Sequence, residues 1–172
     1  MACLNNIPMY KSIYILNQIR TTRDRSEMLL LLESLEKSLF TTRPSIKDVL
    51  EKSSSSKLLQ ALNQELTEQK IPFDNTNELN KFITNIRQEL EDLKTINITL
   101  AIMPTDQIIT TLSKWVEKNL KERKILDITI SSSILGGSLI AANGKYGDYS
   151  VLRKLTDVFA NKRTDIMGAI NK

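Results

Sequence analysis

The chain has 172 residues, of which 41% are hydrophobic and 26% are charged, and its formal net charge is +4. It contains no histidine and only one cysteine, Cys3, so the sequence excludes an internal disulfide, a cysteine metal cluster and any catalytic constellation that requires histidine. Because there are only five glycines and four prolines, we expect a mainly helical globular protein with short connections.

Charge divides the chain into two parts. Residues 1–94 carry 13 basic and 13 acidic side chains, whereas residues 95–172 carry 11 basic and 7 acidic ones, so the second part holds the whole excess of +4. This division predicts two modules, of which the second is mildly basic. The excess is too small to indicate a nucleic-acid surface by itself.

Apolar residues in the first part recur at helical spacing. The pattern predicts helices over residues 4–20, over residues 26–40, after Ser45, over residues 58–66 and over residues 75–94. Polar residues 21–25 interrupt the pattern, the serine run 53–56 is read as a linker, and the dipeptide before Phe73, Ile71-Pro72, is expected to end the fourth helix. The first part is therefore predicted to be an all-helical bundle.

The spacing of apolar residues changes after residue 95. Alternating apolar residues predict a strand over residues 96–102, and Thr105 or Asp106 then caps a helix with Trp115 packed at the edge of its apolar face. Further strands are expected at 125–130, 138–142 and 145–148, the last two joined by the tight turn Asn143-Gly144. Ser150 caps a final helix that is expected to fray beyond residue 161. The predicted class is α+β, a helical bundle followed by a small β-α-β-β-β-α domain.

No pattern of catalytic residues is evident. Gly136-Gly137 lacks the lysine and the following helix of a phosphate-binding loop, and no nucleophile elbow is present. Asp127 and Asp148 could form a carboxylate pair only if the fold brought them together, which nothing in their spacing predicts. We therefore expect neither enzymatic activity nor a cofactor or metal site, and binding to another protein is the favoured function.

An apolar groove in the helical part could hold an amphipathic helix of a partner. The candidate groove residues are Tyr10, Ile13, Tyr14 and Phe82, although each of them fits a core position equally well. No apolar run approaches the ~20 residues that a membrane-spanning helix requires, so membrane association is expected only indirectly, through a partner.

The region from residue 126 to residue 155 resembles the carboxyl-terminal signature of the delta subunit of F-type ATP synthase, which in mitochondria is called the oligomycin-sensitivity-conferring protein. The turn after the second strand and the start of the last helix carry this resemblance. The matching residues are Ser133, Ile134, Leu135, Gly136, Gly137, Asp148, Ser150, Val151, Lys154 and Leu155. The order of the predicted elements is similar to the family over the whole chain.

The resemblance implies a non-catalytic stator subunit that acts in ATP synthesis and hydrogen ion transport. The helical bundle, residues 1–94, would bind the amino-terminal segment of an α subunit on the catalytic head, and residues 95–172 would bind the stalk b subunits. The signature residues would define the fold rather than perform chemistry. No nucleic acid and no cofactor are implied.

Two alternatives stay open, a generic helical adaptor between proteins and a weak nucleic-acid binder with few aromatic residues for stacking. The absence of an evident transit peptide favours a bacterial subunit, peripheral to the cytoplasmic face of the plasma membrane.

Overall fold

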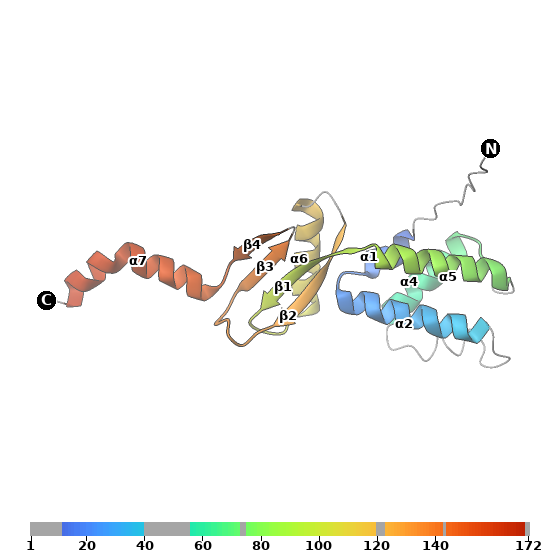
Figure 1. Cartoon of the computed structure of the whole chain (residues 1–172), viewed down its shortest axis with the longest axis horizontal. Helices are drawn as coiled ribbons and strands as arrows, with labels where there is room; N and C mark the ends of the chain where they lie inside the picture. Colours follow the sequence, from blue (N-terminus) through green and yellow to red (C-terminus); the bar gives the residue numbers. More distant parts are fainter. Residues whose placement is uncertain (1–11, 40–55, 73–74, 120–122, 143, 171–172) are drawn as a thin grey trace. The chain divides into compact units, whose positions relative to one another are not determined.

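The computed structural model describes residues 12–39, 56–72, 75–119, 123–142 and 144–170. The chain divides into two compact units. Unit 1 contains residues 1–19 and 23–93, and unit 2 contains residues 20–22 and 94–172. Unit 1 is helical and unit 2 holds a four-stranded sheet, so the protein has the α+β fold that the sequence predicts (Figure 1).

Four described helices build unit 1: α1 (Ile13–Gln18), α2 (Thr22–Leu39), α4 (Ser56–Glu68) and α5 (Thr76–Glu91). Each directs an apolar stripe inward, as amphipathic helices around a common core do. The core side chains that are almost fully buried are Ile15, Met28, Leu32, Leu62, Ile83, Ile86 and Leu90. α1 packs against α4, although α1 contains only six residues.

The side chain of Glu65, on α4, binds the first backbone amides of α1. This side chain is almost fully buried, and its Oε2 accepts the backbone amide of Tyr14 at 2.8 Å and that of Ile15 at 3.4 Å. The Nε2 of Gln69 donates to its other oxygen at 2.9 Å. A helix leaves its first amides without internal partners, so the buried carboxylate acts as a cap supplied by another helix.

Several predicted boundaries in unit 1 need correction. α2 begins at Thr22 rather than at residue 26, because polar residues can form the first, largely exposed turn of a helix and Asp24 complements its dipole there. α4 ends at Glu68, where Lys70 takes a left-handed φ of 52° and the Ile71 amide donates back to Leu66, so a helix-ending turn and not Pro72 stops it. The helix expected after Ser45 lies outside the described residues.

α5 agrees most closely with the sequence pattern. The Oδ1 of Asn75 accepts the amide of Glu78 at 3.3 Å and so caps the helix. The helix ends at Glu91 instead of continuing to residue 94, because Lys94 already belongs to the first strand.

The sheet of unit 2 has the order β2-β1-β3-β4. Its strands are β1 (Lys94–Leu100), β2 (Lys124–Ile130), β3 (Ser138–Ala142) and β4 (Lys145–Asp148). β1 and β2 are parallel, and α6 (Asp106–Asn119) supplies the crossover that a parallel pair requires. β3 pairs antiparallel with both β1 and β4. Ala142 pairs with Lys145, so β3 and β4 form the predicted hairpin, and Gly144 has a φ of 72°.

The two faces of this sheet differ. Ile96, Ile98 and Leu126 are buried with Val116 of α6, so α6 covers the apolar face. On the opposite face, register places Thr95, Asn97 and Thr99 of β1 beside Ile125, Asp127 and Thr129 of β2, and most of these side chains are polar. The domain therefore has one apolar core layer and one mainly polar face.

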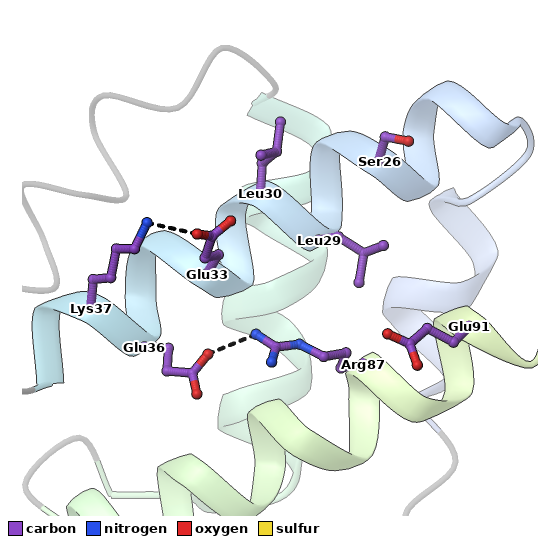
Figure 2. A pocket seen from close by; sticks show the side chains of 8 residues that line it. All are labelled: Ser26, Leu29, Leu30, Glu33, Glu36, Lys37, Arg87 and Glu91. Atoms are coloured by element: carbon purple, nitrogen blue, oxygen red, sulfur yellow. Dashed lines mark hydrogen bonds and ion pairs between the residues drawn. The ribbon is translucent and has the colours of Figure 1, made fainter.

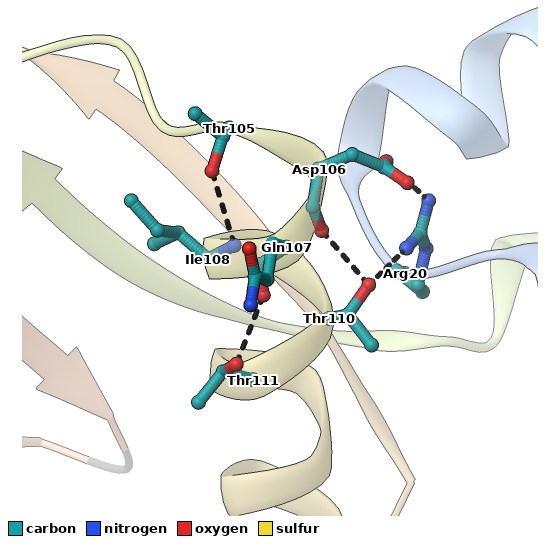
Figure 3. Close-up of polar contacts among 7 residues, drawn as sticks. All are labelled: Arg20, Thr105, Asp106, Gln107, Ile108, Thr110 and Thr111. Atoms are coloured by element: carbon teal, nitrogen blue, oxygen red, sulfur yellow. Dashed lines mark hydrogen bonds and ion pairs between the residues drawn. The ribbon is translucent and has the colours of Figure 1, made fainter.

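Three residues from the amino-terminal part of the chain complete unit 2. Thr21 forms a parallel bridge with Leu126 on the outer edge of β2, and the Leu126 amide donates to the carbonyl oxygen of Arg20 at 2.8 Å. The Thr22 hydroxyl donates to Asp127 at 3.0 Å. Arg20 donates to Thr110 at 2.7 Å and to Asp106 at 2.8 Å, at the start of α6 (Figure 3). The segment thus covers part of an edge strand that would otherwise be open.

Other sequence predictions for unit 2 also change. β1 covers residues 94–100 instead of 96–102, and Ile102 is largely exposed beyond its end. The predicted cap of α6 is confirmed at Thr105, since its Oγ1 accepts the Ile108 amide at 3.4 Å. Trp115 is 48% exposed, which agrees with its predicted position at the edge of the apolar face of α6. The last helix, α7, runs over Val151–Ile170 and continues past residue 161, where fraying was expected.

Candidate functional site

The glycine pair after β2 is held tightly against the start of α7. The amide of Val151 donates to the carbonyl oxygen of Gly136 at 2.9 Å. Gly137 has a φ of +85°, and a Cβ atom there would lie 2.4 Å from the carbonyl oxygen of Tyr149. Gly136 shows no positive φ, but its added Cβ would approach the Val151 side chain to 3.0 Å. Gly137 is therefore needed for its positive φ, and neither Gly136 nor Gly137 leaves enough room for a Cβ atom.

Asp148 and Ser150 complete this anchor. The Ser150 amide donates to the Asp148 Oδ1 at 2.9 Å, and the Ser150 Oγ accepts the Arg153 amide at 3.2 Å, which is the predicted helix cap. The Ser150 hydroxyl first, and its amide second, lower the pKa of the Asp148 carboxyl below its usual range. A charged carboxylate is thus favoured close to the first turn of α7.

The remaining signature residues flank this anchor. Ser133 hydrogen-bonds with Ser131, their Oγ atoms 2.7 Å apart, while Ile134 is buried and Leu135 is largely exposed. Lys154 and Leu155 lie in the first turns of α7, and both are exposed. The signature residues therefore lie around the junction between the turn after β2 and α7, and together they fix the start of α7.

α7 exposes an apolar stripe along its described side chains. The stripe consists of Val151, Leu152, Leu155, Val158 and Phe159, which are between 42% and 59% exposed. Sequence periodicity identified these positions as one face of a helix but could not show whether the helix buries that face within its own domain.

Unit 1 carries a surface groove between α2 and α5 (Figure 2). Leu29 and Leu30 form its apolar part, and Leu30 is 62% exposed. Two ion pairs border it, Lys37–Glu33 at 2.6 Å and Arg87–Glu36 at 2.7 Å. The hydrogen bond from Lys37 lowers the pKa of Glu33 below its ordinary value. The groove is thus a mixed surface of leucine and paired charges.

The three described residues of the predicted groove do not share one surface. Ile13 on α1 is 54% exposed, Tyr14 is half-buried, and Phe82 on α5 is buried in the core. Tyr10 lies outside the described residues. Sequence reasoning missed Leu29 and Leu30, although the signal was present: residues 28–32 are five consecutive apolar side chains, and one face of a helix cannot bury them all.

Asp127 and Asp148 do not form a carboxylate pair. They lie on β2 and β4, which β1 and β3 separate, and Thr22 and Ser150 are their hydrogen-bond partners. Among the described residues, no group of histidine, cysteine and acidic side chains could hold a metal ion. Within that same part of the chain, no helix has both the length and the apolar character needed to cross a bilayer.

The protein thus has two units with exposed apolar surfaces suited to binding other proteins. A family model described as ATP synthase delta (OSCP) subunit matches residues 16–161, which are 146 of the 172 residues. The chain therefore belongs to the OSCP/delta subunit family of F-type ATP synthase, and it is a non-catalytic subunit of the peripheral stalk. No curated protein matches the chain.

Proposed function

We propose that this subunit links the catalytic head of the ATP synthase to the stalk b subunits and resists rotation of the head during proton-driven ATP synthesis. Membership of the family and the division into two units, each with an exposed apolar surface, support this proposal. A connector needs two separate binding surfaces, and a binder of one partner needs only one.

Unit 1 is the proposed partner of the head. In this proposal it binds the amino-terminal segment of an α subunit as an additional amphipathic helix. Two described apolar side chains could contact that helix, Ile13 on α1 and Leu30 in the groove between α2 and α5. Phe82 is buried and would support the surface from inside the bundle.

Paired substitutions distinguish these two surfaces. Leu30→Asp and Ile13→Asp each place a charge on an exposed position, so neither should unfold the bundle. We expect one of them to weaken binding of purified head by at least about tenfold and the other to leave it nearly unchanged. If both variants bind the head as the unaltered protein does, unit 1 does not bind it through either surface.

Unit 2 is the proposed partner of the stalk b subunits. Its residues 95–172 hold the net charge of +4, so binding to acidic stalk helices should weaken as salt rises. Binding that does not respond to ionic strength would contradict this electrostatic contribution. The proposed location is peripheral, at the cytoplasmic face of a bacterial plasma membrane, reached through the complex rather than through lipid.

Reconstitution tests the proposed function. Membranes stripped of the head and of this subunit should recover proton pumping coupled to ATP hydrolysis only when both are added back. Head alone should hydrolyse ATP in solution without coupled pumping. If pumping recovers fully without this subunit, the chain is not the connector, and an adaptor role outside the enzyme would replace the proposal.

A further inference from the structure

Residues 20–22 belong to the sheet domain, although the helices before and after them belong to the helical bundle. The chain leaves unit 1 after Ile19, returns to it at Arg23, and leaves it again after Leu93. The two units are therefore joined by three covalent connections, whereas a chain divided once would have only one. Two of the three exist only because residues 20–22 pair with β2.

The attachment of this segment to β2 is short. It centres on the bridge between Thr21 and Leu126, where the Leu126 amide lies 2.8 Å from the carbonyl oxygen of Arg20. β1, by contrast, pairs with β2 along seven residues. Segments held by few backbone hydrogen bonds open at the lowest free-energy cost, so this one can leave β2 while the β1–β2 ladder stays intact.

Polar side chains on both sides of the bridge hold the segment in place. The Thr22 hydroxyl donates to the Oδ1 of Asp127 at 3.0 Å. Arg20 donates to the Oγ1 of Thr110 at 2.7 Å and to the Oδ1 of Asp106 at 2.8 Å (Figure 3). Because the Asp106 side chain is 64% exposed, solvent and salt weaken this ion pair. The closed position thus depends on a small number of polar contacts.

The connections differ in position as well as in number. Leu93 passes directly into β1 at Lys94, whereas Thr21 lies along the other side of β2 from β1. Neighbouring strands lie about 4.8 Å apart, so the two attachment points on the sheet are separated by about 10 Å. Within unit 1, the Arg25 guanidinium donates to the Leu93 carbonyl oxygen at 3.3 Å and so holds the start of α2 to the end of the bundle. A body held at one point can rotate about the φ and ψ bonds there, but one held at two separated points cannot.

We propose that residues 20–22 form a latch that controls how freely the two units rotate against each other. With the latch on β2, three connections restrain that rotation. With the latch released, only the connection from Leu93 to Lys94 remains. The purpose of the latch rests on the proposed function, since a connector that resists rotation of the head needs this restraint, but the latch itself is a property of the free chain.

Hydrogen exchange of the Leu126 amide in the full chain measures release of the latch, because that amide donates to residue 20. Arg20→Ala combined with Asp127→Ala removes the polar contacts on both sides of the bridge. We expect the Leu126 amide to exchange at least about tenfold faster, while amides of the β1–β2 ladder change by less than about twofold. The matched control, Arg23→Ala combined with Glu27→Ala, removes an ion pair of α2 and should leave the exchange of Leu126 within about twofold.

A disulfide tests whether the closed latch restrains rotation. Thr22→Cys combined with Asp127→Cys, in a chain that also carries Cys3→Ser, places thiols on segments about 4.8 Å apart, and disulfides span Cα distances of about 4.4 to 6.8 Å. NMR relaxation of the backbone amides gives a rotational correlation time for each unit. The oxidised variant and the unaltered chain should show one time common to both units. After reduction, which leaves position 22 without its bond to position 127, the two times should shorten and differ.

Two results would overturn the latch. If the Leu126 amide exchanges no faster than in the control, or if the ladder amides accelerate equally, residues 20–22 are an integral part of the sheet. If reduction of the disulfide leaves the correlation times of the two units unchanged, the segment does not control rotation. Neither result affects the proposed function, which the reconstitution of coupled pumping tests separately. Full pumping without the chain would reject that function and leave the latch measurements as they are.

Discussion

The Val151 amide lies 2.9 Å from the carbonyl oxygen of Gly136, and this hydrogen bond joins the first residue of α7 to the turn that follows β2. Neighbouring contacts strengthen the junction. The Tyr149 amide donates to the Ser138 carbonyl at 2.9 Å, so the chain segment before α7 is held to the first residue of β3. The family signature thus describes a junction between the sheet and the last helix.

Gly137→Ala should destabilise unit 2 by about 2 kcal/mol or more, because alanine disfavours the left-handed backbone and its Cβ would clash with the Tyr149 carbonyl. Gly144→Ala is the matched control. Gly144 also has a positive φ, but its Cβ would meet nothing within 4 Å, so we expect a loss of only about 1 kcal/mol. Urea unfolding followed by the fluorescence of Trp115, the single tryptophan, measures both. Equal losses would contradict the close approach at Gly137.

The pKa of the Asp148 carboxyl should lie below the usual aspartate value of about 3.9. Because its pKa is lowered in the folded state, its contribution to stability is complete above the unfolded pKa and is lost as pH falls through the folded pKa. The backbone amide signal of Ser150, followed by NMR from pH 6 to pH 2, should report that low midpoint. Asp148→Asn should abolish the transition. A midpoint at or above the usual range would contradict the assigned hydrogen bonds.

Glu65→Ala should destabilise unit 1 by about 3 kcal/mol, because the change leaves buried amides of α1 without an acceptor. Glu65→Gln keeps one carbonyl acceptor and should cost about 1 kcal/mol. The control is Glu68→Ala on the same helix, where the side chain is exposed and the expected change is within about 0.5 kcal/mol. Denaturant unfolding followed by circular dichroism measures all three. A Glu65→Ala variant as stable as Glu68→Ala would show that the carboxylate does not cap α1.

Arg20→Ala should destabilise unit 2 by about 1 kcal/mol, since it removes the hydrogen bond to Thr110 and the partly exposed ion pair with Asp106 (Figure 3). Arg23→Ala removes an ion pair with Glu27 in which the arginine itself is 82% exposed, against 23% for Arg20, and should change stability by at most about 0.5 kcal/mol. Trp115 fluorescence in urea reports the difference. If the two substitutions prove equivalent, residues 20–22 do not stabilise unit 2 as the hydrogen bonds indicate.

Local patterns predicted the elements well where a segment's own spacing decides its structure. α5 and the β3–β4 hairpin are examples, because one carries an uninterrupted apolar stripe and the other a strong turn dipeptide. Helix starts were less predictable. The first turn of α2 is polar, so periodicity began only at the first buried residue, Met28.

Two features could not be obtained from sequence for a physical reason. The pairing of Thr21 with Leu126 joins residues 105 positions apart, and no local pattern encodes such a partner. The α7 stripe has the same spacing as a core-facing stripe, since the period of a helix does not reveal what covers it. The solvent exposure of the side chains in the folded domain distinguishes the exposed α7 stripe from a core-facing one. It also shows that Phe82 belongs to the core.

The central claim is that this chain connects head and stalk, and the most direct measurement is its copy number in the ATP synthase purified from native membranes. Quantitative mass spectrometry should find one copy per complex, and stripping the head should release or loosen the chain because half of its attachment is lost. An intact, coupled complex that lacks the chain would contradict the account.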